Sequence, residues 1–372
     1  MLWSLIITLA IISGQLPKLS IGYNANLSLL DTTIGFLCIF GFIRLRFQLK
    51  KTPKFIIFAL LFTVVAIISL ILTPLHLQFA EYLVSSLYIL RFSLYILFAW
   101  LVCSEAFRDF KNKINETLIY SGLGLVGLGL MQFIFLPDLD FISKMGWDPH
   151  YFRTVSTFLD PNFAGAFFVL TLLLLSKKTK IFYIITYLAL LTTFSRSSYL
   201  MFLVSGLTFS ILEKSKKEAA YTILLFVILL LSFQAYTQFV SEPRNIDREQ
   251  SASSRLNTWQ QGWQLFSYHP ILGIGFNAYR FAIREYNLGD EKFIKSHGST
   301  SNDSSLLFVL ATTGIIGLVS YLCFLFTILV YSNNRNTAPV LLGLLVHSIF
   351  SNSLFFPPIL LWLILISIAP KK

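Results

Sequence analysis

The chain alternates between long apolar runs and short polar connections almost from end to end. A helix of about 20 apolar residues crosses the roughly 30 Å hydrocarbon core of a bilayer, and many of these runs approach that length. One connection, residues 241–304, is longer and more polar than the others. The pattern predicts about twelve helices, at 1–16, 27–43, 55–76, 82–104, 117–136, 162–176, 181–195, 197–212, 221–240, 305–331, 338–353 and 356–369.

The composition supports an all-α fold embedded in a membrane. Of the 372 residues, 55% are hydrophobic and 13% are charged, whereas soluble domains carry about 25% charged residues. We therefore predict a single polytopic membrane domain over residues 1–372, with one large extracytoplasmic loop, 241–304, that contains short interfacial helices. The first apolar run lacks a basic leader and an obvious cleavage site, so we expect a retained helix and not a signal peptide.

The positive charges predict how the chain is oriented. The net charge is +11, but the basic residues gather between apolar runs, where they contact anionic membrane lipids, so nucleic acid is not an expected partner. By the positive-inside rule, the connections that carry these clusters lie in the cytoplasm together with both termini. The clusters are 44–54, Arg108, Lys111, Lys113, 177–180, Lys214, Lys216, Lys217, Arg335, Lys371 and Lys372.

Three arginines lie on the opposite, outward side of this predicted topology. They are Arg153, Arg196 and Arg255, each beside the predicted entry of a helix. A single arginine in such a place could simply extend to the lipid headgroups. Three together indicate a site for an anion at the membrane surface, such as a lipid phosphate or diphosphate.

Two residues before the predicted helix at 305 could act as a base. An acceptor hydroxyl needs a group that removes its proton, and either the imidazole of His297 or the carboxylate of Asp303 can do so. The alternative is structural, since Asp303 or Asn302 could merely cap the helix. The sequence leaves both interpretations open.

Several other motifs favour structural roles. Asp160 or Asn162 is expected to cap a helix whose first turn contains Pro161. Gly273 and Gly275 in "GIG" are typical of a turn, although their amides could also approach a ligand. A spacing of three and four residues predicts a short interfacial helix through Leu256, Trp259, Trp263 and Phe266.

Two further residues fall inside predicted helices. Arg91 is expected to be functional or to have a buried partner, because a charge at membrane depth is costly. His347 is more typical of a hydrogen-bonded packing residue than of a proton carrier.

The sequence gives no indication of a metal or cofactor. Cys38, Cys103 and Cys323 have no CxxC spacing, and no DxD-type carboxylate cluster occurs in the segments predicted to face outward. The arginines would therefore have to neutralise a bound diphosphate themselves.

At these residues the chain resembles the O-antigen ligase and O-antigen polymerase superfamily of bacterial envelope glycan enzymes. Four ordered blocks between about residues 150 and 330 carry the resemblance. They are "RTVSTFLDPNFAG", "LTTFSRSSYL", "SRLNTWQQGWQLFSYHPILGIGFNAY" and "NDSSLLFVLATTGIIGL".

The resemblance implies a metal-independent membrane glycosyltransferase in the bacterial cytoplasmic (inner) membrane, with its active site on the extracytoplasmic face. The donor would be a glycan on a polyprenyl diphosphate such as undecaprenyl diphosphate. Ligases transfer the glycan to the lipid A core of lipopolysaccharide or to another acceptor, whereas polymerases join lipid-linked repeat units. The resemblance also implies that Arg196 and Arg255 hold the donor diphosphate, and Arg153 matches a further recurrent arginine.

One block departs from the ligase pattern. Ligases commonly have His-Asn where alignment on the turn Gly314–Gly317 puts Asp303 and Ser304 in this chain. Either Asp303 replaces that histidine as base, or His297 reaches in, or the acceptor differs.

We therefore expect an inverting transfer to a hydroxyl of a lipid, glycan or protein. An O-antigen or exopolysaccharide polymerase is the first alternative. A transporter of lipid-linked glycans and a non-catalytic scaffold are alternatives from other classes.

Overall fold

The computed structural model describes residues 2–22, 25–45, 52–145, 148–175, 180–239, 242–289, 293–294, 297–332 and 334–370. Parts of the predicted basic clusters at 44–54 and 177–180, together with Lys371 and Lys372, lie outside these residues.

The described chain is mostly helical, as the apolar pattern predicts. Each of the twelve predicted runs contains a helix. These helices are α1 (Leu2–Ser13), α2 (Leu29–Leu45), α3 (Lys54–Ile71), α4 (Phe79–Cys103), α6 (Ile114–Phe135), α7 (Pro161–Leu175), α8 (Lys180–Leu191), α9 (Arg196–Leu212), α10 (Lys216–Phe239), α14 (Ser305–Tyr331), α15 (Thr337–His347) and α16 (Pro357–Ile368). Among the described residues, three more α-helices connect them: α5 (Arg108–Asn112), α11 (Glu242–Tyr268) and α12 (Tyr279–Glu285).

Five of these helices are long and apolar enough to cross a membrane. They are α3, α4, α6, α10 and α14. Six others are apolar but have only 10–17 residues: α1, α7, α8, α9, α15 and α16. The membrane character of the fold is therefore supported, whereas the number of crossings stays a prediction.

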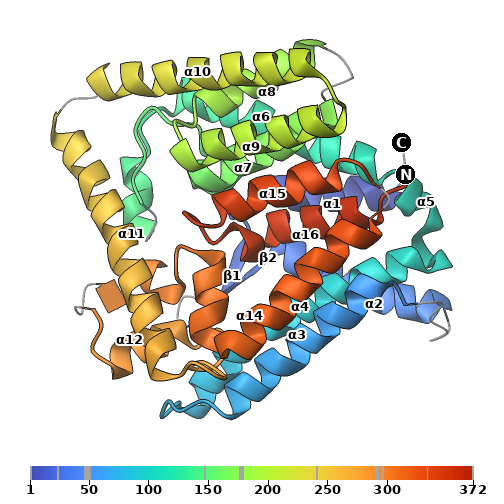
Figure 1. Cartoon of the computed structure of the whole chain (residues 1–372), viewed down its shortest axis with the longest axis vertical. Coiled ribbons are helices and arrows are strands. Elements are labelled where there is room, and N and C mark those ends of the chain that lie inside the picture. The colour runs from blue at the N-terminus through green and yellow to red at the C-terminus, as the bar shows by residue number, and fades with distance from the viewer. Residues whose placement is uncertain are drawn as a thin grey trace.

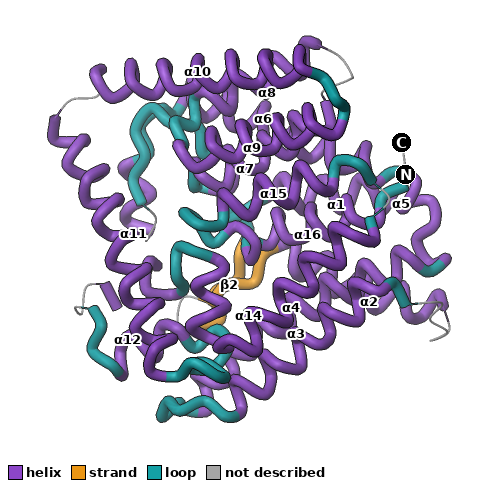
Figure 2. The backbone as a smooth tube through the Cα atoms, in the orientation of Figure 1, coloured by secondary structure: helices purple, strands orange, loops and turns teal. Residues whose placement is uncertain are grey.

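Two features differ from the sequence prediction. A small antiparallel hairpin, β1 (Lys18–Gly22) with β2 (Ala25–Ser28), follows α1 and lies among the helices (Figure 2). The loop 241–304 contains the 27-residue helix α11, so the prediction of a short helix around Trp259 was wrong in length. The start of this helix could not be predicted, because apolar residues with helical spacing occur only in its second half.

The helices are arranged so that one side of the molecule can hold a site. In Figure 1, α11 runs down the left side of the view, from the end of α10 to α12. Both chain ends lie at the right edge of the view. The starts of α9 and α14 and the end of α15 are thus on the side of α11, away from the termini.

The helix α16 lies in the core of the bundle. All of its twelve residues are buried, because it carries apolar side chains all round and begins with two prolines, Pro357 and Pro358, that need no partner for a backbone N–H. It packs against α4, α15 and α6. It thereby supports α15, whose end lies at the site.

The buried cation Arg91 has a structural partner. Its guanidinium makes two 2.8 Å hydrogen bonds to the carboxylate of Asp31, and Tyr95 donates a third to the same group at 2.9 Å. Arg91 also donates to the carbonyl of Asn26 in the hairpin at 2.9 Å. A bidentate pair of this kind satisfies both charges inside the protein. Arg91 therefore has a structural role, since it connects α4 to α2 and to the hairpin.

The helix α14 is broken at Gly314, which has φ +63° and ψ −165°. The "GIG" segment of the large loop fills the break. The N–H groups of Ile274 and Gly275 donate to the carbonyls of Ala311 and Thr312, each at 3.1 Å. A β-carbon on Gly314 would overlap the carbonyl of Ile271. The two amides are therefore occupied within the protein, which favours the structural interpretation of this motif over ligand binding.

Candidate active site

The candidate residues come together where the starts of α7, α9 and α14 meet the end of α15 and the middle of α11. The start of α7 is fixed by Asp160, whose Oδ1 accepts hydrogen bonds from the N–H groups of Asn162 (2.6 Å) and Phe163 (3.2 Å). Pro161 is the first residue of the helix. This confirms the predicted cap, and it places Asn162 at the centre of the cluster.

Arg153 supports the turn that precedes α9. Its Nε donates to the carbonyl of Thr193 at 2.9 Å and its Nη2 donates to that of Phe194 at 3.2 Å. Phe194, at φ +47°, stacks on Tyr236 of α10 with ring centroids 4.0 Å apart. At least two N–H groups of Arg153 therefore hold this turn in place by hydrogen bonds.

Arg196 is presented at the end of that turn as the first residue of α9. Its side chain is exposed, and its guanidinium lies 5.5 Å from the ring of Phe233. Ser195 caps the helix by accepting from the N–H of Ser198. An exposed guanidinium on a braced helix start is well placed to bind an anion.

A buried polar network lies behind Arg196. Ser195 donates to Oδ1 of Asn162 at 2.8 Å, and Ser198 donates to the carbonyl of the same residue at 3.1 Å. The Nε2 atom of His347 lies 3.3 Å from the hydroxyl of Ser197 and 3.4 Å from that of Ser198. The network joins α7, α9 and α15.

Asp303 does not cap α14. Ser304 is the capping residue, since its hydroxyl accepts from the N–H of Leu307, while Oδ1 of Asn302 accepts from the N–H of Ser304. The carboxylate of Asp303 instead accepts a 2.9 Å hydrogen bond from the hydroxyl of Thr258 on α11. The capping interpretation of Asp303 and of Asn302 is therefore wrong.

The surroundings of Asp303 shift the pKa of its carboxyl group upward. Burial raises the pKa of this carboxyl above its usual range, although the hydrogen bond from Thr258 and the positive charge of Arg255 act in the opposite direction. The negative charge of Asp160 raises it further. A raised pKa makes a carboxylate a stronger base, which favours a role in removing a proton from a hydroxyl.

The approach of α11 to α14 depends on a glycine. A β-carbon on Gly262 would lie 2.6 Å from Nδ2 of Asn302 and 2.9 Å from Cγ of Leu307. The amide of Asn302 also donates to Tyr279 at 3.1 Å and to the carbonyl of Thr258. These contacts hold Thr258 against Asp303, and nothing in the local sequence pattern indicated them.

The structure places Arg153 and Arg196 at the same turn, and it places Arg255 within electrostatic range of Asp303. The charge of Arg255 acts on both Asp303 and His347, and His347 contacts the residue after Arg196. Arg153 holds the turn before Arg196. His297 begins a single 3-10 turn, His297–Thr300, but its side chain lies outside the described residues.

Carboxylates also gather here, which the sequence did not indicate. Asp148 carries an electrostatic interaction with both Asp160 and Asp303. Within the described ranges, no group of three or more His, Cys, Asp or Glu side chains could hold a metal ion. These carboxylates come from three separate segments, so no DxD-type spacing in the sequence could predict them.

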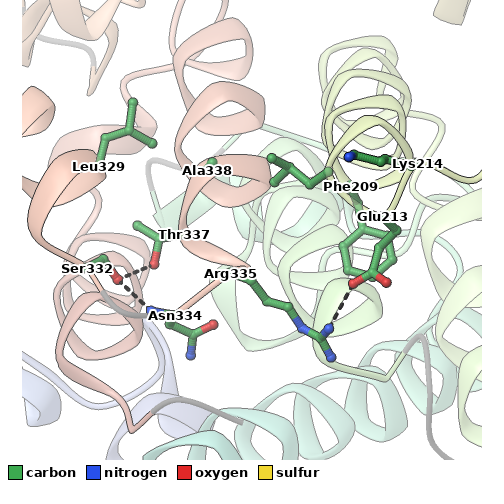
Figure 3. Close-up of a pocket in the computed structure, with 10 residues that line it drawn as sticks. Phe209, Glu213, Lys214, Leu329, Ser332, Asn334, Arg335, Thr337 and Ala338 are labelled. Carbon is green, nitrogen blue, oxygen red and sulfur yellow. Dashed lines mark hydrogen bonds and ion pairs between the residues drawn. The ribbon is translucent and has the colours of Figure 1, made fainter.

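An open pocket lies at the other end of the bundle (Figure 3). It is formed where α9 and α14 end and α15 begins, and Arg335 and Glu213 form an ion pair of 2.9 Å in its wall. None of the candidate residues lines it. The 17 residues of α9 separate it from Arg196 by about 25 Å.

Comparison with known proteins supports the resemblance. No curated protein matches the chain. A family model described as O-antigen ligase matches residues 181–322, a segment that contains Arg196, Arg255, Asp303 and the break of α14 at Gly314. Over this segment, which is less than half of the chain, the protein is similar to the O-antigen ligase family, whose members are membrane glycosyltransferase-like enzymes.

Proposed function

We propose that the protein is a ligase-type glycosyltransferase that moves a glycan from a polyprenyl diphosphate to an acceptor hydroxyl. The reaction takes place at the outer face of the bacterial cytoplasmic membrane, and both termini are cytoplasmic. The proposal is supported chiefly by the electrostatic interaction of Arg255 with Asp303, together with the exposed guanidinium of Arg196 at the turn that Arg153 holds.

The proposed reaction is a single displacement with inversion. The carboxylate of Asp303 takes the proton of the acceptor hydroxyl. At the same time the hydroxyl oxygen forms a bond to the anomeric carbon of the donor sugar. The bond between that carbon and the diphosphate oxygen breaks, and polyprenyl diphosphate leaves with the electron pair. His297 is the alternative base.

The arginines stabilise the leaving group in this proposal. Negative charge increases on the diphosphate as the glycosidic bond breaks, so guanidinium groups already in place lower the barrier. Arg196 and Arg255 contact the diphosphate, and Arg153, predicted to bind it as well, contributes by holding the turn of Arg196. No metal or cofactor is required in this scheme.

Substitution of Arg196 by alanine tests the proposal. The variant should insert into membranes normally and lose about 100-fold or more in transfer from a lipid-linked donor, as loss of one oxyanion donor does elsewhere. Arg335→Ala is a matched control, because Arg335 forms an exposed ion pair at the other end of the bundle. Near-normal transfer by Arg196→Ala would refute the diphosphate role.

The two superfamily reactions differ in acceptor and can be separated in cells. After disruption of the gene, mass spectrometry of surface and lipid-linked glycans should show long lipid-linked chains that are no longer attached. Accumulation of single repeat units would instead identify a polymerase. Movement of lipid-linked glycan across vesicles without a new glycosidic bond would identify a transporter.

A further inference from the structure

His347 is a buried polar residue at the meeting point of the helices that carry the site. It is the last residue of α15 and is 0% exposed. Its Nε2 lies 3.3 Å from the hydroxyl of Ser197 and 3.4 Å from that of Ser198, and the backbone of Asn162 also interacts with the ring. These contacts fit the hydrogen-bonded packing role that the sequence predicts, and they also connect the end of α15 to the start of α9.

The next residue joins the same helix end to α14. The carbonyl of Ser348 accepts a 2.9 Å hydrogen bond from the N–H of Ser305, and the hydroxyl of Ser305 accepts one from Leu354 at 3.2 Å. His347 and Ser348 therefore contact the start of α9 on one side and the start of α14 on the other. The start of α9 carries Arg196, and the start of α14 follows Asp303 in the chain.

We infer that His347 is a positioning residue that fixes Arg196 relative to Asp303. It acts through the hydroxyls of Ser197 and Ser198 and does not touch the substrate, since it is fully buried. The inference rests on the proposed function. In this role His347 sets the distance between Arg196, which binds the leaving diphosphate, and Asp303, which removes the acceptor proton.

The geometry gives a reason why this distance needs a polar contact. The contacts of His347 are polar, since its imidazole faces the hydroxyls of Ser197 and Ser198 at the start of α9. Apolar contacts are not directional, whereas a hydrogen bond between the imidazole and two serine hydroxyls defines the rotation of α9 about its axis. A small rotation of α9 would move the guanidinium of Arg196, which lies at the end of a long side chain.

Two variants of His347 separate positioning from packing. His347→Leu fills the space but removes the polar contact, whereas His347→Gln keeps an amide that can bond the serine hydroxyls. We expect His347→Leu to remain folded, to bind polyprenyl diphosphate about tenfold more weakly, and to lose transfer by at least that factor. His347→Gln should retain both within about threefold.

A double-mutant cycle tests whether the effect passes through the serines. Combining His347→Leu with Ser197→Ala and Ser198→Ala should cost no more than the larger of the two separate losses, because both changes break the same contact. Additive losses would overturn the inference. So would normal binding and transfer by His347→Leu.

The binding measurement keeps this test distinct from that of the proposed function. Purified wild-type protein that binds polyprenyl diphosphate but transfers no glycan would refute the proposed function alone, and the variants of His347 could still be compared by binding. If His347→Leu does not fold, the serine double variant with an intact His347 gives the same comparison. Normal diphosphate binding by that variant would also overturn the inference.

Discussion

The hydrogen bond from Thr258 to Asp303 predicts a measurable change in the pH dependence of transfer. The substitution Thr258→Val keeps the shape of the side chain and replaces the hydroxyl by a methyl group. Thr258 is 3% exposed and its hydroxyl lies 2.9 Å from Oδ2 of Asp303. Since this bond stabilises the carboxylate form, its loss should raise the pKa of Asp303 further.

The size of the change follows from the bond. A hydrogen bond to a charged group contributes about 1.5–3 kcal/mol, and about 1.4 kcal/mol corresponds to one pH unit. A base is active when it is deprotonated, so transfer should fall on the acidic side of the pKa. The same hydroxyl also lies 2.9 Å from the carbonyl of Arg255, which shares its single hydrogen. In Thr258→Val the acidic limb should therefore move to higher pH by about one unit, the lower end of this range.

The assay is kcat/KM for glycan transfer, measured across pH with a purified lipid-linked donor. Ser267→Ala is a suitable control, because Ser267 also lies on α11 and its hydroxyl donates to a helix carbonyl away from the cluster. The reasoning fails if the acidic limb of Thr258→Val stays where it is in the wild type. It also fails if the limb moves to lower pH.

Two further predictions concern the framework of the site. Gly314→Ala should lower the stability of the purified protein by about 2 kcal/mol or more, because Gly314 has φ +63° and a β-carbon there would overlap Ile271. Gly127→Ala is the control and should change the stability little, since a β-carbon at Gly127 would meet nothing within 4 Å. Equal melting temperatures for the two variants would contradict this prediction. Arg91→Met should cost about 3–5 kcal/mol of stability by leaving Asp31 buried without its cation. The double variant Arg91→Met/Asp31→Asn should recover part of that loss, and a fully additive loss would argue against the ion pair.

The apolar pattern was sufficient to predict where the helices are. Each predicted run contains a helix because a long apolar segment has few other ways to satisfy its backbone inside a membrane. The cap at Asp160 was also predictable, since the capping residue, the proline and the helix are adjacent in sequence. Local chemistry of this kind can be read without knowledge of the fold.

Contacts between distant segments could not be predicted in the same way. The partner of Arg91 is Asp31, 60 residues away, and Thr258 meets Asp303 across 45 residues. Asp303 was a plausible cap on sequence grounds, yet Ser304 takes that role. Which of two adjacent polar residues caps a helix depends on where the backbone turns, and here contact with α11 determines that.

The break in α14 has a consequence for how substitutions in this protein should be interpreted. The backbone of the loop that follows α11 is bonded directly to α14 on both sides of Gly314, since Ile274 and Gly275 donate to carbonyls before it and Pro270 accepts from Ile315 after it. A displacement of α11 therefore carries the first turns of α14 with it. Substitutions far along the large loop can consequently alter turnover without any contact to either substrate.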